Sequence, residues 1–280
     1  MRGSGKHAGL KHSDPVPMIR FVNLTIFPEL FSSFLEHGIV RKAIDQKTID
    51  VSTVNIRDFA KDRHRTTDDR PYGGGCGMVM KPEPLAAAIR HARNEVSDSK
   101  TILLTPQGQV LNQKMVRNFA YEKGLILVCG RSDGVDERIC SDFIDHEISV
   151  GDYILTGGEL GAMIIIEAIT RLIPGSLGGT DSAEKDSFSD DLLEHAHYTR
   201  PRTFEGETVP EVLMSGNHKK IEKWRLETAL IRTFLKRKDL LKNRAFTEQE
   251  SNILKKWRFE IEEIIRTQSL CGPVALSGDQ

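Results

Sequence analysis

The stretch VGDYILTGG, residues Val150–Gly158, joins an apolar strand pattern to an apolar helix pattern. We expect the strand over Ile148–Leu155 and the helix over Glu159–Leu172. Because glycine has no Cβ atom, a backbone that contains it can approach a ligand closely. We therefore interpret this stretch as the core of a ligand-binding site.

Two earlier apolar segments also end in glycine turns. Thr101–Thr105 precedes the turn PQG at 106–108, and Leu125–Cys129 precedes Gly130. A helix is expected over Asn112–Tyr121, between these two strands. Strands that alternate with helices are typical of a parallel sheet covered by helices. Ligands bind such sheets outside the carboxyl ends of the strands. We predict an α/β fold with all three glycine turns at one edge.

The N-terminal part adds two strands and a charged loop. The strands are expected over Ile19–Ile26 and Ile49–Ile56, with a helix from Pro28 to Gly38 between them. The segment Arg57–Arg70 is dense in both charges and is expected to be a long loop. Its arginines and histidine could hold phosphates, or they could pair with the neighbouring aspartates.

The C-terminal part has a helical pattern and a basic excess. Twelve Lys and Arg stand against five Asp and Glu between His218 and Trp257, so this surface either attracts phosphates or is a solvated helix face. A capping box from Thr247 to Glu250 indicates the start of a last helix. The helix before it is predicted to bury one face made of Ile221, Trp224, Thr228, Ile231 and Leu235.

Composition bounds the class of protein. The 280 residues suit one large domain or two ordinary ones, and the net charge of −1 gives no sign of a nucleic-acid partner by itself. No apolar run reaches membrane-spanning length, and the N-terminus lacks the apolar core of a secretory signal. The four cysteines show no CxxC or zinc-ligand spacing, so we expect reduced thiols in a cytoplasmic protein.

The common nucleotide motifs are absent. The glycines from Gly73 to Gly77 are not followed by Lys-Ser/Thr, and Met80 stands where a dinucleotide fingerprint needs its third glycine. A P-loop and a dinucleotide-binding fingerprint are therefore disfavoured. By pattern alone Arg171 is an ordinary arginine at a helix end, and Asp186 belongs to a hydrated acidic loop.

Longer motifs resemble a known family. They read DDRPYGGG at 68–75, LILVCGR at 125–131, VGDYILTGGEL at 150–160, HYTRP at 197–201 and SGNH at 215–218. In this order they resemble the bacterial tRNA (guanine-N1)-methyltransferases, the TrmD family of the SPOUT class. The resemblance extends from about Met18 to Thr267.

The resemblance implies a SPOUT-type parallel sheet with a C-terminal trefoil knot, plus a small all-α C-terminal domain. It implies a homodimer whose active sites lie at the interface, with no membrane association. The glycine turns would then bind S-adenosylmethionine. The implied cofactor-binding residues are Leu104, Pro106, Gly130, Val150, Gly151, Asp152, Tyr153, Ile154, Leu155 and Gly158.

The implied reaction is methylation of tRNA at N1 of the guanosine just 3′ of the anticodon, position 37, when another G precedes it. By position in the motifs Asp186 is the general base, and Arg171 stabilises negative charge on O6. The family also suggests Mg²⁺, although the sequence shows no metal-ligand cluster. The residues expected to contact tRNA are His64, Asp68, Arg70 and His218.

The expected organisation follows from the resemblance and the composition. Residues 1–17 form a disordered leader, 18–177 the cofactor-binding domain, 178–193 a flexible linker, 194–268 the tRNA-binding domain and 269–280 a tail. Two positions depart from the family pattern: Asp133 stands where a glutamate is common, and Cys76 where a proline is common. A non-catalytic RNA-binding protein and a ribosomal RNA methyltransferase remain alternatives.

Overall fold

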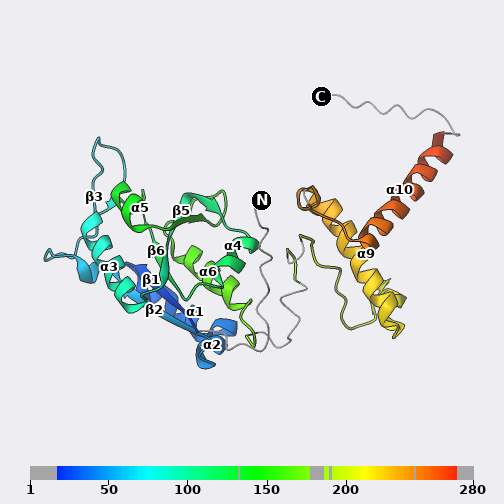
Figure 1. Ribbon diagram of the computed structural model, residues 1–280, viewed down its shortest axis with the longest axis horizontal. Helices are drawn as coiled ribbons and strands as arrows, with labels where there is room; N and C mark the ends of the chain where they lie inside the picture. The colour runs from blue at the N-terminus through cyan, green and yellow to red at the C-terminus, as the bar shows by residue number, and fades with distance from the viewer. Residues whose placement is uncertain (1–17, 132, 177–185, 189–190, 243, 270–280) are drawn as a thin grey trace, which may run out of the picture. The chain divides into compact units, whose positions relative to one another are not determined.

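The computed structural model divides the chain into two compact units, Met1–Ala183 and Glu184–Gln280 (Figure 1). It describes residues 18–131, 133–176, 186–188, 191–242 and 244–269. The expected leader, most of the expected tail and residues 178–185, 189 and 190 of the expected linker lie outside the described residues. No helix in the described part of the chain is long and apolar enough to cross a membrane.

A five-stranded parallel sheet forms the centre of the first unit, in the order β2-β1-β6-β5-β7. Strand β5 pairs with both β6 and β7, so the segment 106–108 inside β5 is brought close to the glycine turns that follow β6 and β7. The predicted α/β class with a parallel sheet is confirmed. The strands are β1 Ile19–Thr25, β2 Ile49–Asn55, β5 Ser99–Val110, β6 Gly124–Cys129 and β7 His146–Ser149.

Helices cover both faces of this sheet, with a separate apolar core on each side. Helices α2, α4 and α6 pack on one face, where Leu125 and Leu127 of β6 meet Ile165 and Ile169 of α6. Helices α3 and α5 pack on the other face, around Ile126. Their bounds are α2 Gly38–Asp45, α3 Pro82–Glu95, α4 Gln113–Phe119, α5 Glu137–Phe143 and α6 Glu159–Thr170.

Three predicted boundaries are wrong. The strand expected over Thr101–Thr105 runs from Ser99 to Val110, so the turn expected at 106–108 lies inside β5, where the pairing with β7 shifts register between Leu104 and Gln109. The strand expected to run through Leu155 ends at Ser149, because the chain turns at Gly151, where φ is +149°. The helix expected to close at Gly38 ends earlier: a 3-10 turn and the short α1 helix (Ser32–Glu36) precede a second helix that starts at this glycine. The stretch 150–158 is therefore a loop between β7 and α6.

The expected charged loop contains short elements. A 3-10 turn covers Ile56–Phe59, and β3 (Asp68–Asp69) pairs antiparallel with β4 (Val79–Met80). The glycine-rich segment lies between these two strands, and Met80 N donates to Gly134 O at 3.0 Å. The segment is thereby tied to the turn that follows β6.

The second unit contains helices α8 (Glu211–Met214), α9 (His218–Lys236) and α10 (Glu248–Ser269). The expectation of an all-α domain is wrong in one detail, since Thr203–Phe204 and Glu207–Thr208 form a two-stranded antiparallel hairpin, β8-β9.

The face that α9 buries also differs from the prediction. Ile231 and Leu235 are exposed, whereas Leu230 and Thr233 are fully buried. The periodic apolar pattern therefore pointed to the wrong side of this helix over its last two turns. The buried threonine has a hydrogen bond to the chain that precedes the helix.

The predicted capping box at the start of α10 is confirmed. Thr247 N donates to Glu250 Oε2 at 2.8 Å, and Glu250 N donates to Thr247 Oγ1 at 3.2 Å. The Glu250 carboxylate also accepts two hydrogen bonds from Arg244, each 2.8 Å long, with both side chains almost completely buried. The Arg244 guanidinium, followed by the hydrogen bonds from Thr247, lowers the pKa of Glu250 below its usual 4.5.

We predict that Glu250→Gln lowers the free energy of unfolding of the second unit by about 3 kcal/mol, because it leaves a buried arginine without its carboxylate partner. The wild-type advantage is complete above pH 4.5 and is lost as the pH falls through the lowered pKa of the folded state. Trp224 and Trp257 both lie in this unit, so tryptophan fluorescence during urea unfolding measures it. The exposed pair Arg258–Glu262 supplies the control: Glu262→Gln should change little.

Candidate functional site

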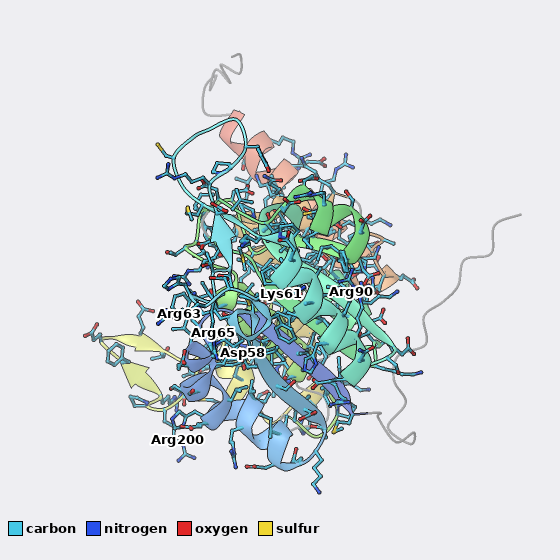
Figure 2. All side chains as sticks on the ribbon, turned by 90° about the vertical axis from the view of Figure 1, so that its left-hand side faces the viewer. Asp58, Lys61, Arg63, Arg65, Arg90 and Arg200 are labelled. Carbon is cyan, nitrogen blue, oxygen red and sulfur yellow. The ribbon has the colours of Figure 1, made fainter. Side chains whose placement is uncertain are left out.

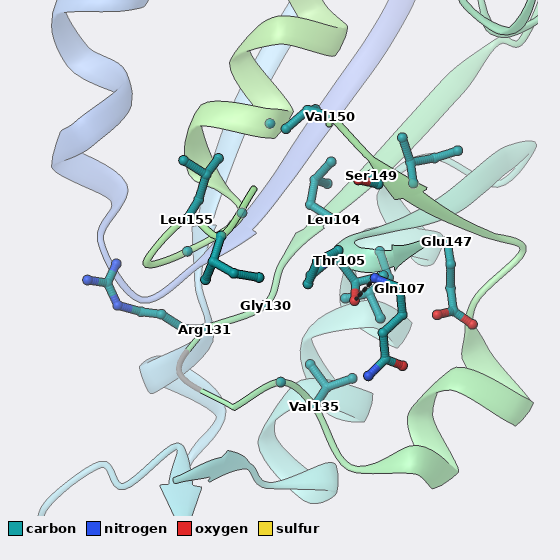
Figure 3. A pocket seen from close by; sticks show the side chains of 18 of the residues that line it. Leu104, Thr105, Gln107, Gly130, Arg131, Val135, Glu147, Ser149, Val150 and Leu155 are labelled. Atoms are coloured by element: carbon teal, nitrogen blue, oxygen red, sulfur yellow. Dashed lines mark hydrogen bonds between the residues drawn. The ribbon is translucent and has the colours of Figure 1, made fainter. Parts of the chain in front are cut away.

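A pocket of about 440 Å³ lies at the carboxyl edge of the sheet (Figure 3). Three segments line it: residues 103–107 of β5, the turn after β6 and the β7–α6 loop. Leu104, Val150 and Leu155 supply apolar side chains, while backbone groups of the turns line much of the remainder. This volume is in the range of sites for small organic ligands.

Nine of the ten residues predicted to bind the cofactor line this pocket, and Asp152 does not. The lining also includes residues that were not predicted, among them Arg131, Val135 and Glu147 (Figure 3). Their positions follow from the turn after β6 and from the paired ends of β5 and β7. Arg131 closes the motif at 125–131 without having been assigned a role, and no motif included Val135 or Glu147.

The backbone at Gly158 is the tightest part of the pocket wall. A Cβ atom at this position would lie 2.8 Å from both Cys129 Cα and Leu104 Cβ. In addition, Gly158 N donates to Gly130 O at 2.9 Å. Only glycine allows the start of α6 to contact the ends of β5 and β6 so closely.

A buried carboxylate supports the same wall. Glu159 is 3% exposed and accepts a hydrogen bond of 2.7 Å from Thr25 Oγ1. Arg131 Nη1 lies 3.6 Å from Glu159 Oε2, and its guanidinium lies 4.2 Å from the centre of the Phe27 ring. The sequence did not identify this network, although an acidic residue directly after two glycines in an apolar segment was a usable signal. The network ties β1 to two of the pocket turns.

The β7–α6 loop has hydrogen bonds of its own. Ser149 Oγ donates to Gly151 O at 3.0 Å, and Tyr153 Oη donates to Val150 O at 3.1 Å. Tyr153 N donates to Gly151 O at 2.9 Å. These hydrogen bonds define the conformation of the loop within the single chain, even though Ile154 is 81% exposed.

The thiols near the pocket are poor nucleophiles. Burial, helped by the charges of Glu147 and Glu137, raises the pKa of Cys140 to about 11. Burial and then the charge of Glu159 raise the pKa of Cys129 well above its usual value. Because the reactive form is the thiolate, neither side chain suits covalent catalysis at neutral pH. Cys76 is exposed and does not line the pocket.

The two residues assigned to chemistry lie in different units. Arg171 follows the last residue of α6, at the opposite end of that helix from Gly158 and the pocket. Asp186 is half-buried and belongs to the second unit. Asp133 does line the pocket, and a Cβ atom on Gly77 would collide with its carboxylate. The glycine-rich segment thus contacts a side chain of the pocket wall.

The residues predicted to contact RNA are spread over both units. In the first unit His64 and Arg70 are exposed and Asp68 is half-buried, whereas His218 is the exposed first residue of α9. Lys61, Arg63 and Arg65 are exposed and lie within three positions of His64 in the sequence. Figure 2 shows Arg63 and Arg65 close to Asp58. Of these, Arg65 pairs with Asp58 at 3.1 Å. Both readings of the charged loop, ion pairing and phosphate binding, therefore keep some support.

Within the described residues, the ligand atoms of Glu194, His195 and His197 lie within 4.8 Å of one another. His197 Nε2 already pairs with Glu194 Oε1 at 2.9 Å, and His195 Nδ1 lies 2.9 Å from Ala196 O. Imidazole ligands suit zinc or nickel, whereas Mg²⁺ prefers oxygen. This group therefore gives no support to a Mg²⁺ site.

Comparison with known proteins assigns the family. Residues 19–243 match the family model described as tRNA (Guanine-1)-methyltransferase TrmD. A tRNA (guanine-N(1)-)-methyltransferase of Desulfatibacillum aliphaticivorans is 54% identical over 92% of this chain and 99% of its own length. One from Carboxydothermus hydrogenoformans is 51% identical over 86% and 95%, and one from Dictyoglomus turgidum is 48% identical over 88% and 99%. The chain belongs to the TrmD family.

We predict that Gly158→Ala destabilises the first unit by about 1–3 kcal/mol, because the new methyl group overlaps a backbone atom and a side-chain stem that cannot move independently. The measurement is thermal unfolding followed by circular dichroism. Gly130→Ala is the matched control in the same pocket: its Cβ atom would have ordinary contacts of 3.5 Å or more, so its stability should change little. Equal losses in the two variants would contradict the steric argument.

Proposed function

We propose that this chain transfers the methyl group of S-adenosylmethionine to N1 of the guanosine at position 37 of tRNAs in which another G precedes it. The observation that carries the proposal is a glycine-walled pocket at the sheet edge in a member of the TrmD family. The relatives with about 50% identity are named tRNA (guanine-N(1)-)-methyltransferases.

The pocket fits the proposed cofactor in size and chemistry. Apolar side chains such as Leu104 and Val150 suit an adenine ring, and the glycine turns leave backbone amides and carbonyls close to the space. When bound, S-adenosylmethionine supplies a methyl group on a positively charged sulfur that leaves as a neutral thioether.

Residues of the chain have to remove the proton from guanine N1 and stabilise the negative charge that develops on O6. Guanine N1 carries a proton at neutral pH, and we assign its removal to the Asp186 carboxylate. As N1 loses this proton, negative charge develops on O6, and we assign its stabilisation to the Arg171 guanidinium. A carboxylate alone is a weak base for this proton, so the two residues have to act together.

Arg171 and the pocket of its own chain are too far apart for this role, which supports a homodimer with shared active sites. The twelve residues of helix α6 lie between Gly158 and Arg171, which are therefore about 20 Å apart along the helix axis at 1.5 Å per residue. Leu160 and Ile164 on this helix are 57% and 43% exposed, and Ile154 in the preceding loop is 81% exposed. Such an apolar surface beside a pocket is typical of a subunit interface. We infer that Arg171 serves the partner's pocket.

We further propose the division of labour and the topology that the family implies. Residues 18–177 would bind the cofactor, with a trefoil knot made by the segment 106–108 inside β5 and the turns after β6 and β7, and 194–268 would bind tRNA. The hydrogen bond from Gly158 to Gly130 and the double pairing of β5 with β7 support close contact of these turns. The basic excess from His218 onward supports phosphate contacts. With its described cysteines free, the protein is proposed to act in the cytoplasm.

One test of the proposed function concerns the general base, Asp186. Asp186→Ala should lose at least 100-fold in the single-turnover rate of methyl transfer to a G36-G37 tRNA, since general bases contribute about 10²–10⁴-fold. Tritium transfer from labelled S-adenosylmethionine measures this rate, and circular dichroism establishes that the variant is folded. A tRNA with A36-G37 is the substrate control and should be methylated far more slowly by the wild type. Full activity of Asp186→Ala would remove the base assignment, and equal rates on the two tRNAs would remove the specificity.

A second test concerns the shared site. Arg171→Ala and Gly130→Leu, which fills the pocket, should each be inactive alone. Mixed by co-unfolding and refolding, they should recover roughly a quarter of the wild-type activity, because half of the dimers then contain one intact site. Refolding each variant alone is the control. If the mixture stays inactive while wild-type protein survives the same treatment, Arg171 acts on its own chain's pocket.

A further inference from the structure

The chain around Asp186 is attached to helix α9 by a short series of hydrogen bonds. Glu194 N donates to Ser187 Oγ at 3.0 Å, and Phe188 N donates to Leu192 O at 2.8 Å. Leu193 N then donates to Thr233 Oγ1 at 2.9 Å. The residue next to Asp186 is thereby linked, through two consecutive backbone amides, to a side chain of the helix.

Thr233 is a buried polar residue whose hydroxyl makes two hydrogen bonds. It is fully buried in the second unit, on the side of α9 that the apolar pattern did not predict. Its hydroxyl donates to Ala229 O at 2.7 Å and accepts from Leu193 N, so its proton and one lone pair are both used. A buried hydrogen bond of this kind fixes the backbone that it holds, because breaking it leaves an amide without a partner.

A second contact lies one turn further along. The Arg237 guanidinium lies 5.6 Å from the centre of the Phe188 ring, close enough for a cation–π interaction. Phe188 itself has a φ of +69°, a conformation that a bulky residue adopts only when its surroundings hold it there. Two sides of the chain next to Asp186 are therefore held by the C-terminal part of α9 and the residue that follows it.

We propose that Thr233 is a positioning residue for the methylation reaction: by holding Leu193 it keeps the Asp186 carboxylate in place relative to helix α9. This inference rests on the proposed role of Asp186 as general base. As a consequence, the general base is attached to the unit proposed to bind tRNA. It is therefore placed at the reaction centre when the RNA binds, and its position does not depend on the cofactor. Thr233 touches neither substrate nor cofactor in this role.

Helix α9 contains a matched control for the experiment. The Thr228 hydroxyl also donates to the helix backbone, to Trp224 O at 2.8 Å and Arg225 O at 3.1 Å. Among the described residues, Thr228 makes no hydrogen bond to the chain around Asp186, whereas Thr233 bonds Leu193. Thr228→Val therefore removes only a hydrogen bond within the helix, while Thr233→Val removes such a bond and the link to Leu193 as well.

The test is single-turnover methyl transfer with saturating S-adenosylmethionine and G36-G37 tRNA. Thr233→Val should lower the rate constant about tenfold, as expected when one buried hydrogen bond is lost. The reaction amplitude and the dissociation constants of tRNA and S-adenosylmethionine should change less than about twofold. Thr233→Ser, which keeps the hydroxyl, should restore the rate, and Thr228→Val should behave as wild type. A role in folding alone would lower the amplitude and leave the rate constant unchanged.

Ser187→Ala tests the same series of bonds without disturbing the helix, and it should also lower the rate constant. A normal rate constant in Thr233→Val or in Ser187→Ala would overturn the positioning role. The parallel Asp186→Ala measurement separates the two proposals. If Asp186→Ala is inactive while Thr233→Val is normal, the base assignment stands and the positioning inference fails; if Asp186→Ala is fully active, the proposed base itself is wrong.

Discussion

The close contact of three backbone segments at Gly158 is the constraint on which the pocket depends. The start of α6 lies against the ends of β5 and β6, and the distance leaves no space for a side chain at this residue. The buried Glu159 next to it extends the contact to β1 through Thr25 and to the turn after β6 through Arg131. The apolar cores on the two faces of the sheet fix the positions of these segments, so the shape of the ligand pocket depends on the core packing.

The pocket wall and the two residues assigned to the chemistry belong to three different parts of the chain. The pocket wall belongs to the rigid sheet edge, Arg171 to the far end of α6 and Asp186 to a segment bonded to α9. In the proposed reaction these groups meet only when a second protomer and tRNA are present. Methyl transfer would then be limited to the complete assembly, which protects the cofactor from reaction with water or with other nucleophiles.

The sequence predicted much of this arrangement, and particular residues explain the rest. Apolar runs that end in glycine turns were sufficient to predict the parallel sheet and the edge at which the pocket lies, whereas the nine predicted residues that line the pocket came from the family resemblance. The strand end at Ser149 was missed because Val150, Ile154 and Leu155 are apolar although they line the pocket beyond the strand, which local patterns cannot distinguish from strand packing. The buried face of α9 was missed because Thr233 is polar and its partner lies forty positions earlier in the chain. Assigning roles to Asp186 and Arg171 required the family resemblance, since spacing alone made both ordinary.

In the proposed dimer, the length of helix α6 sets the distance between the pocket at its start and Arg171 at its end, and this limits how the sequence can change. Its first residues close one pocket, and Arg171 at its other end is proposed to serve a second pocket. Inserting a single residue would rotate Arg171 by roughly 100° around the helix axis and advance it by about 1.5 Å. Loops elsewhere in the first unit can lengthen at little cost, but this helix tolerates neither insertion nor deletion without moving the guanidinium away from its target. The length of α6, counted in residues, should therefore be as restricted as the identity of the arginine itself.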